Sequence, residues 1–245
     1  MDRSSTEDHN IDMMMDLYSP NSSIKLGYAD PIFDYSTSIK TILNFKELFT
    51  TDRQLGAGEF GVTYLIRDNN NHPYALKISI FEGDDDPDIK REIKSLIYFA
   101  TPKCHPHLLC YLDHFILNNR ICILTEYIDE KTLSDSKNLS IQAIESIYLE
   151  LLDTLAWMHS KGYNHGDIKS DNIMITPQGQ VKLIDFGFTT KMDSQYKQSE
   201  ITEDLYHLSI CISDVLYNKN PRLCFKKLLK ILLNVIYFIF KNNKI

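Results

Sequence analysis

The sequence has no excess of basic residues, no framework of paired cysteines and no long apolar run. It holds 26 Lys and Arg against 33 Asp and Glu, a formal net charge of -7, and no basic block with interleaved aromatics stands out. Electrostatics therefore disfavour a nucleic-acid partner. The five cysteines are odd in number and scattered, which predicts reduced thiols and a cytoplasmic location. The first residues contain no apolar run typical of a signal peptide.

The most apolar stretch is residues 223–240. Its continuous part is about ten residues long and is interrupted by Asn234, which makes it too short to span a bilayer. We expect a closing core helix here. A basic helix lying on a membrane surface is the alternative, and a membrane partner is otherwise not expected.

The N-terminal residues 1–45 mix Asp, Ser, Asn and Met with little periodicity. This composition predicts a disordered tail, with a short partner-binding helix around residues 11–18 as the alternative. We expect ordered structure from about residue 46 to residue 245. The segment from Cys104 to Cys110 gathers two Cys and two His, but its spacing matches no common zinc finger.

Residues 163–187 carry the groups that phosphoryl transfer requires. Asp167 and Asn172 lie five positions apart, and Asp185 is followed by Phe186 and Gly187. Carboxylate and amide oxygens at these positions can hold a divalent metal, and a further carboxylate can steer a hydroxyl toward a phosphate.

This stretch resembles the catalytic loop and the metal-binding Asp-Phe-Gly triplet of the eukaryotic protein kinases. The resemblance implies that Asp167 orients the substrate hydroxyl and accepts its proton. It implies that Asn172 and Asp185 hold Mg²⁺. Lys169, two residues after Asp167, matches the Ser/Thr-specific subgroup, in which this Lys meets the γ-phosphate.

A glycine-rich segment at residues 55–62 lies between two strand-like runs and predicts a hairpin over the phosphates of ATP. Glycines let the backbone approach phosphate oxygens. On the following strand, Lys77 matches the family's phosphate-contacting lysine, and Glu92 on the next helix is its expected partner. The run Leu124–Ile128 resembles the hinge between lobes, with Thr125 at the back of the adenine pocket. The expected nucleotide-binding set is Leu55, Gly56, Gly58, Gly61, Val62, Ala75, Lys77, Glu92, Glu126, Ile128 and Met174.

The resemblance predicts an α+β, bilobal fold over residues 46–245. We expect a small lobe at about residues 46–126, with a five-stranded sheet and one helix, and a reduced helical lobe at about residues 130–245. A helix that begins near Ser140 should support the catalytic loop.

Two departures from the family pattern are present. Gly166 stands where the family usually has Arg, which pairs with a phosphorylated activation-loop residue. Only 16 residues separate Gly187 from Asp204, and no Ala-Pro-Glu triplet occurs among them. Asp204 resembles the start of a buried helix and should accept hydrogen bonds from the backbone near His165. We therefore expect an enzyme that activation-loop phosphorylation does not switch.

The predicted function is ATP- and Mg²⁺-dependent phosphorylation of Ser/Thr hydroxyls in protein substrates. Two alternatives stay open at this point. One is a small-molecule kinase or an atypical kinase of the tRNA-modification type, since these also carry His-Gly-Asp. The other is a nucleotide-binding pseudokinase that acts as an adaptor, since the substrate platform is missing.

Overall fold

The computed structural model describes residues 40–41, 45–83, 87–129, 131–136, 139–176 and 179–219. The predictions for the N-terminal tail and for residues 223–240 lie outside the described residues. The chain divides into two compact units, and each is described by itself. Unit 1 comprises the chain up to Lys103 together with Cys110–Tyr127, and unit 2 comprises Cys104–Leu109 and the chain from Ile128 onward.

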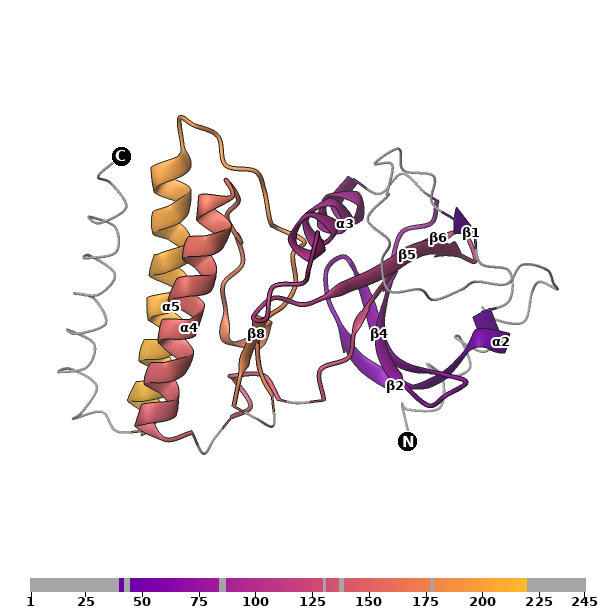
Figure 1. Cartoon of the computed structure of the whole chain (residues 1–245), viewed down its shortest axis with the longest axis horizontal. Coiled ribbons are helices and arrows are strands. Elements are labelled where there is room, and N and C mark those ends of the chain that lie inside the picture. Colours follow the sequence, from indigo (N-terminus) through magenta and orange to yellow (C-terminus); the bar gives the residue numbers. More distant parts are fainter. Residues whose placement is uncertain are drawn as a thin grey trace, which may run out of the picture. The chain divides into compact units, whose positions relative to one another are not determined.

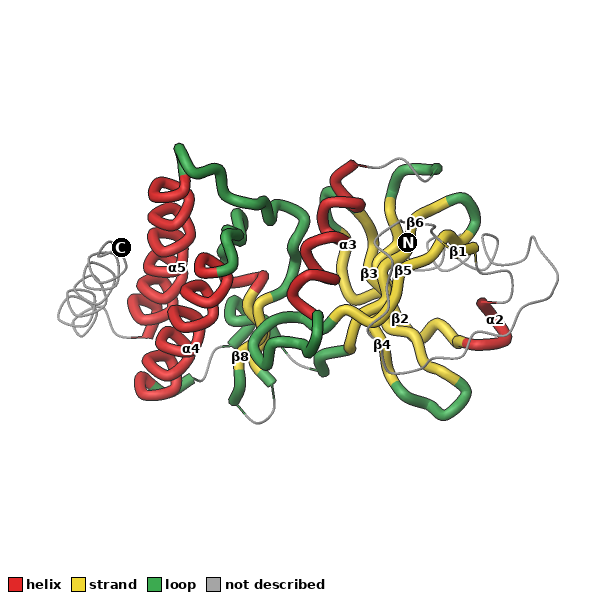
Figure 2. The backbone as a smooth tube through the Cα atoms, turned by 45° about the horizontal axis from the view of Figure 1, so that its top comes forward, coloured by secondary structure: helices red, strands yellow, loops and turns green. Residues whose placement is uncertain are grey.

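Unit 1 is built on one sheet with the strand order β1-β5-β6-β4-β3-β2. Its strands appear in yellow in Figure 2. The predicted strands are β2 (Phe49–Ala57), β3 (Gly61–Asp68), β4 (Pro73–Ser79), β5 (Tyr111–Leu117) and β6 (Arg120–Glu126). The structure adds the two-residue strand β1 (Lys40–Thr41), parallel to β5, and the one-turn helix α2 (Phe45–Leu48), neither of which was predicted. All other pairings are antiparallel.

One face of this sheet carries an apolar core. Aromatic rings from α2, β2 and β5 pack together here, with ring centroids 5.2 Å apart for Phe45 and Phe49 and 6.2 Å apart for Phe45 and Phe115. The predicted turn between β5 and β6 is confirmed, because Asn118 and Asn119 both have positive φ, as a two-residue hairpin turn requires.

Helix α3 (Pro87–Ala100) belongs to the same unit. Pro87 opens it, at a position where proline's missing N–H costs nothing. Ile89, Ile93 and Leu96 form its buried face, and Glu92 is buried among them. The predicted partner of Lys77 is therefore on the face of α3 that turns away from water.

Unit 2 is dominated by two long helices, α4 (Ile141–Ser160) and α5 (Lys197–Lys219), which lie side by side in Figure 1. Ser140 caps α4 by accepting a hydrogen bond from the backbone N of Ala143 at 3.0 Å, as predicted. The predicted apolar face is buried along its whole length, in Ile144, Ile147, Tyr148, Leu151, Leu152, Leu155 and Met158.

Helix α5 begins at Lys197, seven positions before Asp204, so the prediction that this helix starts at Asp204 was wrong. A turn precedes the helix, in which Asp193 Oδ1 accepts a hydrogen bond from the backbone N of Gln195 at 2.7 Å. The residues after this turn, Lys-Gln-Ser-Glu, lack the Pro or Gly that would delay a helix. Only residues 188–196 therefore link Gly187 to the helix.

A two-stranded ribbon, β7 (Ile173–Ile175) and β8 (Val181–Leu183), follows the 3-10 turn η1 (Ser170–Asn172). The segment 104–109 pairs with β8, since Leu183 N donates to His107 O at 2.9 Å and Leu109 N donates to Leu183 O at 3.0 Å. In the same unit the His105 ring lies against the indole of Trp157, with centroids 4.6 Å apart.

Cys104 and Cys110 are each disulfide-bonded, so the expectation of reduced thiols is wrong for these two. Cys122 and Cys211 are free and buried, and burial raises the pKa of the Cys122 thiol to about 12. Among the described residues, no helix is long and apolar enough to cross a membrane.

Candidate active site

The predicted nucleotide-contacting lysine of unit 1 is paired as expected. Lys77 on β4 donates to both carboxylate oxygens of Glu92, at 2.9 Å to Oε1 and 2.7 Å to Oε2. The side chains are 17% and 4% exposed. A buried carboxylate is costly unless it is paired, so this ion pair fixes the position of the lysine ammonium.

The predicted glycine-rich hairpin is confirmed as the turn between β2 and β3. The backbone N of Gly58 donates to the carbonyl of Gly61 at 2.9 Å. Phe60 at its tip is buried, and its ring centroid lies 5.9 Å from Lys77 Nζ.

The glycines of this hairpin differ in their surroundings. A Cβ on Gly61 would lie 2.5 Å from the carbonyl oxygen of Ile78, whereas a Cβ on Gly56 or Gly58 would meet nothing within 4 Å. Of these three positions, only position 61 therefore requires glycine because of packing within unit 1.

The predicted adenine-contacting residues are divided between the units. Leu55, Val62, Ala75 and Glu126 belong to unit 1, whereas Ile128 and Met174 belong to unit 2. Thr125 is buried on β6. The backbone N of Glu126 donates to the carbonyl of Cys110 at 3.0 Å, and its carbonyl accepts the Thr125 hydroxyl at 3.3 Å.

The predicted catalytic residues of unit 2 lie in direct contact. Asn172 Nδ2 donates to Asp167 Oδ2 at 2.8 Å and to the Asp167 backbone carbonyl at 2.9 Å. Lys169 Nζ donates to the same Oδ2 at 2.5 Å. Burial alone would lower the pKa of Lys169, but its hydrogen bond to Asp167 and the charges of Asp167, Asp185 and Asp171 raise it above its ordinary value.

The second predicted metal ligand, Asp185, follows β8. The residue before it, Ile184, donates its backbone N to the carbonyl of Asn172 at 2.9 Å. Asp185 has φ +64°, and the backbone N of Gly187 donates to its Oδ1 at 3.3 Å. Phe186 is fully buried, with its ring centroid 5.3 Å from that of His165. The buried ring of Phe186 therefore anchors the Asp-Phe-Gly triplet beside His165.

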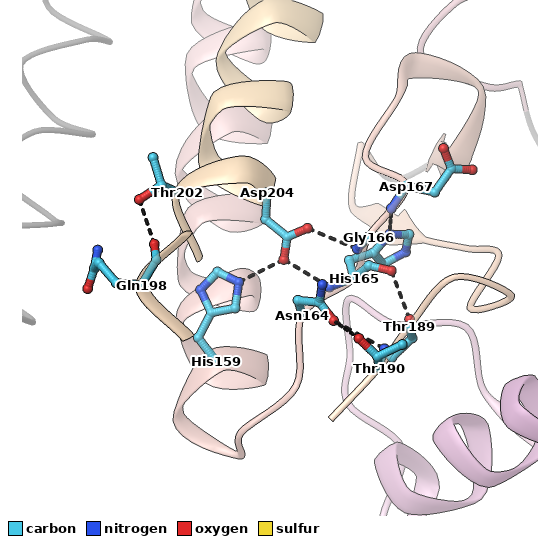
Figure 3. Close-up of polar contacts among 10 residues, drawn as sticks. All are labelled: His159, Asn164, His165, Gly166, Asp167, Thr189, Thr190, Gln198, Thr202 and Asp204. Atoms are coloured by element: carbon cyan, nitrogen blue, oxygen red, sulfur yellow. Dashed lines mark hydrogen bonds and ion pairs between the residues drawn. The ribbon is translucent and has the colours of Figure 1, made fainter. Parts of the chain in front are cut away.

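Asp204 supports the catalytic loop from α5, as predicted (Figure 3). Its Oδ2 accepts the backbone N–H of His165 at 2.8 Å, and its Oδ1 accepts that of Gly166 at 3.0 Å. Oδ2 also lies 2.8 Å from Nε2 of buried His159. Burial by itself would raise the pKa of Asp204, but these hydrogen bonds and the nearby imidazoles lower it below its ordinary value of 3.8.

His165 is fully buried, and burial lowers its pKa below the ordinary 6.5. A neutral ring can accept through Nδ1, which lies 3.3 Å from the backbone N of Asp167. The imidazole thus helps to hold the backbone of Asp167, the predicted catalytic residue.

Sequence reasoning missed His159, Asn164, Thr189 and Thr190 as parts of this site. Asn164 Oδ1 accepts from both the backbone N and the hydroxyl of Thr190, and Thr189 Oγ1 donates to the carbonyl of His165. No motif marks these pairs, because their partners are 24 and 26 positions apart in the sequence.

Comparison with known proteins agrees with this arrangement. The protein kinase domain model matches residues 49–209. The chain is 30% identical over 203 residues to serine/threonine-protein kinase pakH of Dictyostelium discoideum, covering 80% of this chain and 37% of the relative. It is 30% identical over 171 residues to serine/threonine-protein kinase dst4 of the same organism, covering 67% of this chain and 35% of the relative. It is 31% identical over 159 residues to Aurora kinase B of Mus musculus, covering 61% of this chain and 46% of the relative.

The chain therefore spans less than half the length of these relatives. The family match nevertheless covers more than half of the chain. It includes the Lys77–Glu92 ion pair and the hydrogen-bonded residues around Asp167 and Asp204. The chain belongs to the protein kinase domain family.

Proposed function

We propose that this chain transfers the γ-phosphoryl group of ATP to serine and threonine hydroxyls of protein substrates. The observation that carries the proposal is the 2.5 Å contact between Lys169 Nζ and Asp167 Oδ2. It places a cation beside the carboxylate that would orient the acceptor hydroxyl. The names of the relatives, which are serine/threonine-protein kinases, support this choice of acceptor.

ATP and Mg²⁺ supply the transferable group and offset the charge on its oxygens. In unit 1, Lys77 would bind phosphate oxygens, since Glu92 fixes its ammonium group on a buried face. Gly56 and Gly58 have open space where a Cβ would stand. Bare backbone at these two positions suits the close approach of phosphate oxygens.

In unit 2, Asn172 and Asp185 would hold the metal. Asn172 donates through Nδ2 to Asp167, which directs its amide oxygen away from that residue. The described residues include no cluster of three or more His, Cys, Asp or Glu that could hold a metal ion. One carboxylate and one amide oxygen still fit Mg²⁺, which usually takes one or two carboxylates together with substrate phosphates.

Asp167 would orient the acceptor hydroxyl and take its proton. Among the described residues, both side-chain hydrogen bonds to Asp167 end on Oδ2, so Oδ1 would be the oxygen that accepts the substrate's O–H. Lys169 would offset negative charge that develops on the transferred group. These groups contribute position and electrostatics, which account for most of the catalysis in phosphoryl transfer.

The test is transfer of labelled γ-phosphate from Mg-ATP to a mixed protein substrate and, separately, to small alcohols. Wild type is compared with Asp167→Ala and with Asp153→Ala, which removes an exposed carboxylate of α4 in the same unit. We expect labelled serine and threonine with wild type and Asp153→Ala, and a loss of at least about 100-fold with Asp167→Ala.

Label found only on small alcohols would replace the proposed acceptor with a small molecule. Nucleotide binding without any transfer would favour the adaptor role. Metal-dependent nucleotide binding separates the two acidic residues further, because Asp185→Ala should abolish it whereas Asp167→Ala should leave it unchanged. Equal loss of binding in both variants would contradict the assigned roles.

A further inference from the structure

The segment after the metal-binding triplet is tied to the backbone that precedes the catalytic loop. Lys191 and Tyr163 form an antiparallel bridge. The backbone N of Asn164 donates to the carbonyl of Thr190 at 3.2 Å, and that of Met192 donates to the carbonyl of Gly162 at 2.8 Å. Residues 189–192 thus run antiparallel beside residues 162–165.

Side chains reinforce this backbone pairing (Figure 3). Asn164 Oδ1 accepts the backbone N–H of Thr190 at 3.1 Å and its hydroxyl at 2.9 Å. Thr189 Oγ1 donates to the carbonyl of His165 at 3.1 Å. Asn164 is 8% exposed and Thr189 is 0% exposed. We refer to Asn164, Thr189 and Thr190 as the clasp.

The clasp connects the two ends of the catalytic machinery in unit 2. Asn164 lies three residues before Asp167, and Thr190 lies five residues after Asp185. The hydrogen bonds of Thr190 to Asn164 are partly buried and that of Thr189 to His165 is buried. Such bonds hold their partners to one geometry, because breaking them leaves polar groups unpaired away from water. Opening of the clasp would therefore let the segment that carries Asp185 shift relative to the loop that carries Asp167.

The hydroxyls of Thr189 and Thr190 both donate hydrogen bonds within the clasp region, to the carbonyl of His165 and to Asn164 Oδ1. The hydroxyl of Thr189 is inaccessible to a modifying enzyme, because the residue is fully buried. Order in this segment thus comes from contacts present in the unmodified chain.

We propose that Asn164 and Thr190 are positioning residues for phosphoryl transfer. Their contact keeps residues 188–192 against the catalytic loop and so sets Asp185 relative to Asp167 in the unphosphorylated protein. The proposal rests on the phosphotransferase function proposed above. According to this proposal, the uncharged pair Asn164 and Thr190 orders the segment between Gly187 and α5.

The experiment compares steady-state kinetics of wild type, Asn164→Ala, Thr190→Val and Thr190→Ser after phosphatase treatment. Thr190→Val keeps the size and the backbone N–H but removes the hydroxyl, whereas Thr190→Ser keeps the donor. Thr202→Val is the matched control, because Thr202 is exposed on α5. Among the described residues its hydroxyl donates to the carbonyl of Gln198 on the same helix, at 2.7 Å (Figure 3). Thermal melts establish that each variant is folded at the assay temperature.

We expect kcat to fall about tenfold in Asn164→Ala and about threefold to tenfold in Thr190→Val, a tenfold loss corresponding to about 1.4 kcal/mol. The KM for ATP should change less than twofold, and Thr190→Ser and Thr202→Val should retain wild-type kcat. Loss of kcat only in proportion to the unfolded fraction would indicate a structural role and overturn the proposal.

Other outcomes separate the two proposals. If wild type and Thr190→Val have equal kcat, the clasp does not position the site and the proposed function stands. If Thr190→Ser loses as much activity as Thr190→Val, the hydroxyl is not the determinant and the positioning role is overturned. If phosphatase-treated wild type transfers no phosphate although untreated wild type does, order depends on phosphorylation and the inference fails. If neither form transfers phosphate, the proposed function itself fails.

Discussion

Replacing Gly166 with alanine should damage the protein far more than its exposed position suggests. Gly166 has φ +82°, and a Cβ there would lie 2.6 Å from the carbonyl oxygen of Phe188 and 3.2 Å from its carbonyl carbon. Both atoms belong to the backbone, so a rotamer change cannot relieve the clash. The added methyl must therefore push residue 188 away from the catalytic loop.

The cost has two parts. A left-handed conformation costs a non-glycine residue about 1–2 kcal/mol, and forcing extra volume into a packed contact costs about 1–3 kcal/mol. Together they predict a loss of about 2–5 kcal/mol of folding free energy. Gly162→Ala is the matched control, because Gly162 has φ +84° but a Cβ added there would meet nothing within 4 Å. It should lose only the first part, about 1–2 kcal/mol.

The assay is urea denaturation followed by circular dichroism, together with kcat for each folded variant. Gly166→Ala should lose at least about 1 kcal/mol more than Gly162→Ala, and its kcat should fall because the clasp is displaced. Gly166→Arg restores the residue usual in the family, yet it should be at least as damaging. Equal losses at positions 166 and 162, or an active and stable Gly166→Arg, would refute the steric reasoning.

Three further predictions concern other contacts. Glu92→Gln should lower kcat/KM about 10- to 100-fold by weakening the charge-assisted bonds to Lys77. Glu82→Gln, which changes an exposed carboxylate paired with Arg120, should match wild type in the same kinase assay. Similar losses in both variants would contradict the role of Glu92 as the partner that fixes Lys77. The depressed pKa of Asp204 means that its stabilising contribution is present at neutral pH and is lost as pH falls below its ordinary 3.8. Asp204→Asn should therefore be less stable at neutral pH and should lack this acid-dependent loss. Parallel pH profiles of unfolding free energy for the two proteins would contradict the prediction. Ser194→Glu, which adds a phosphate-like charge at an exposed position, should leave kcat within about twofold; a large rise would show that the segment is switched by charge.

Much of the fold could be predicted because periodic burial reflects local geometry. The apolar positions of α4 recur at helical spacing, and the structure buries all of them. The Lys77–Glu92 pair and the role of Asp204 followed from family motifs whose geometry is reproduced here. In each case the signal was a periodic pattern within one element or a family motif.

The remainder depends on contacts between distant segments, which no local pattern encodes. Asn164 and Thr190 are ordinary polar residues until the chain brings them together across 26 positions. The start of α5 was misplaced because motif matching located Asp204 but not the helical turns before it. The pairing of residues 104–109 with β8 was likewise invisible, since it rests on backbone hydrogen bonds that any side chain would allow.

The contact between the His105 and Trp157 rings has a practical consequence for measuring these effects. Trp157 is the chain's single tryptophan, and it belongs to unit 2. Tryptophan fluorescence therefore reports the unfolding of that unit alone, and protonation of the adjacent imidazole should quench it. Burial lowers the pKa of His105 below the ordinary 6.5, so in the folded protein quenching should set in only at lower pH. The wild-type chain thus carries its own optical label for the unit that contains Asp167.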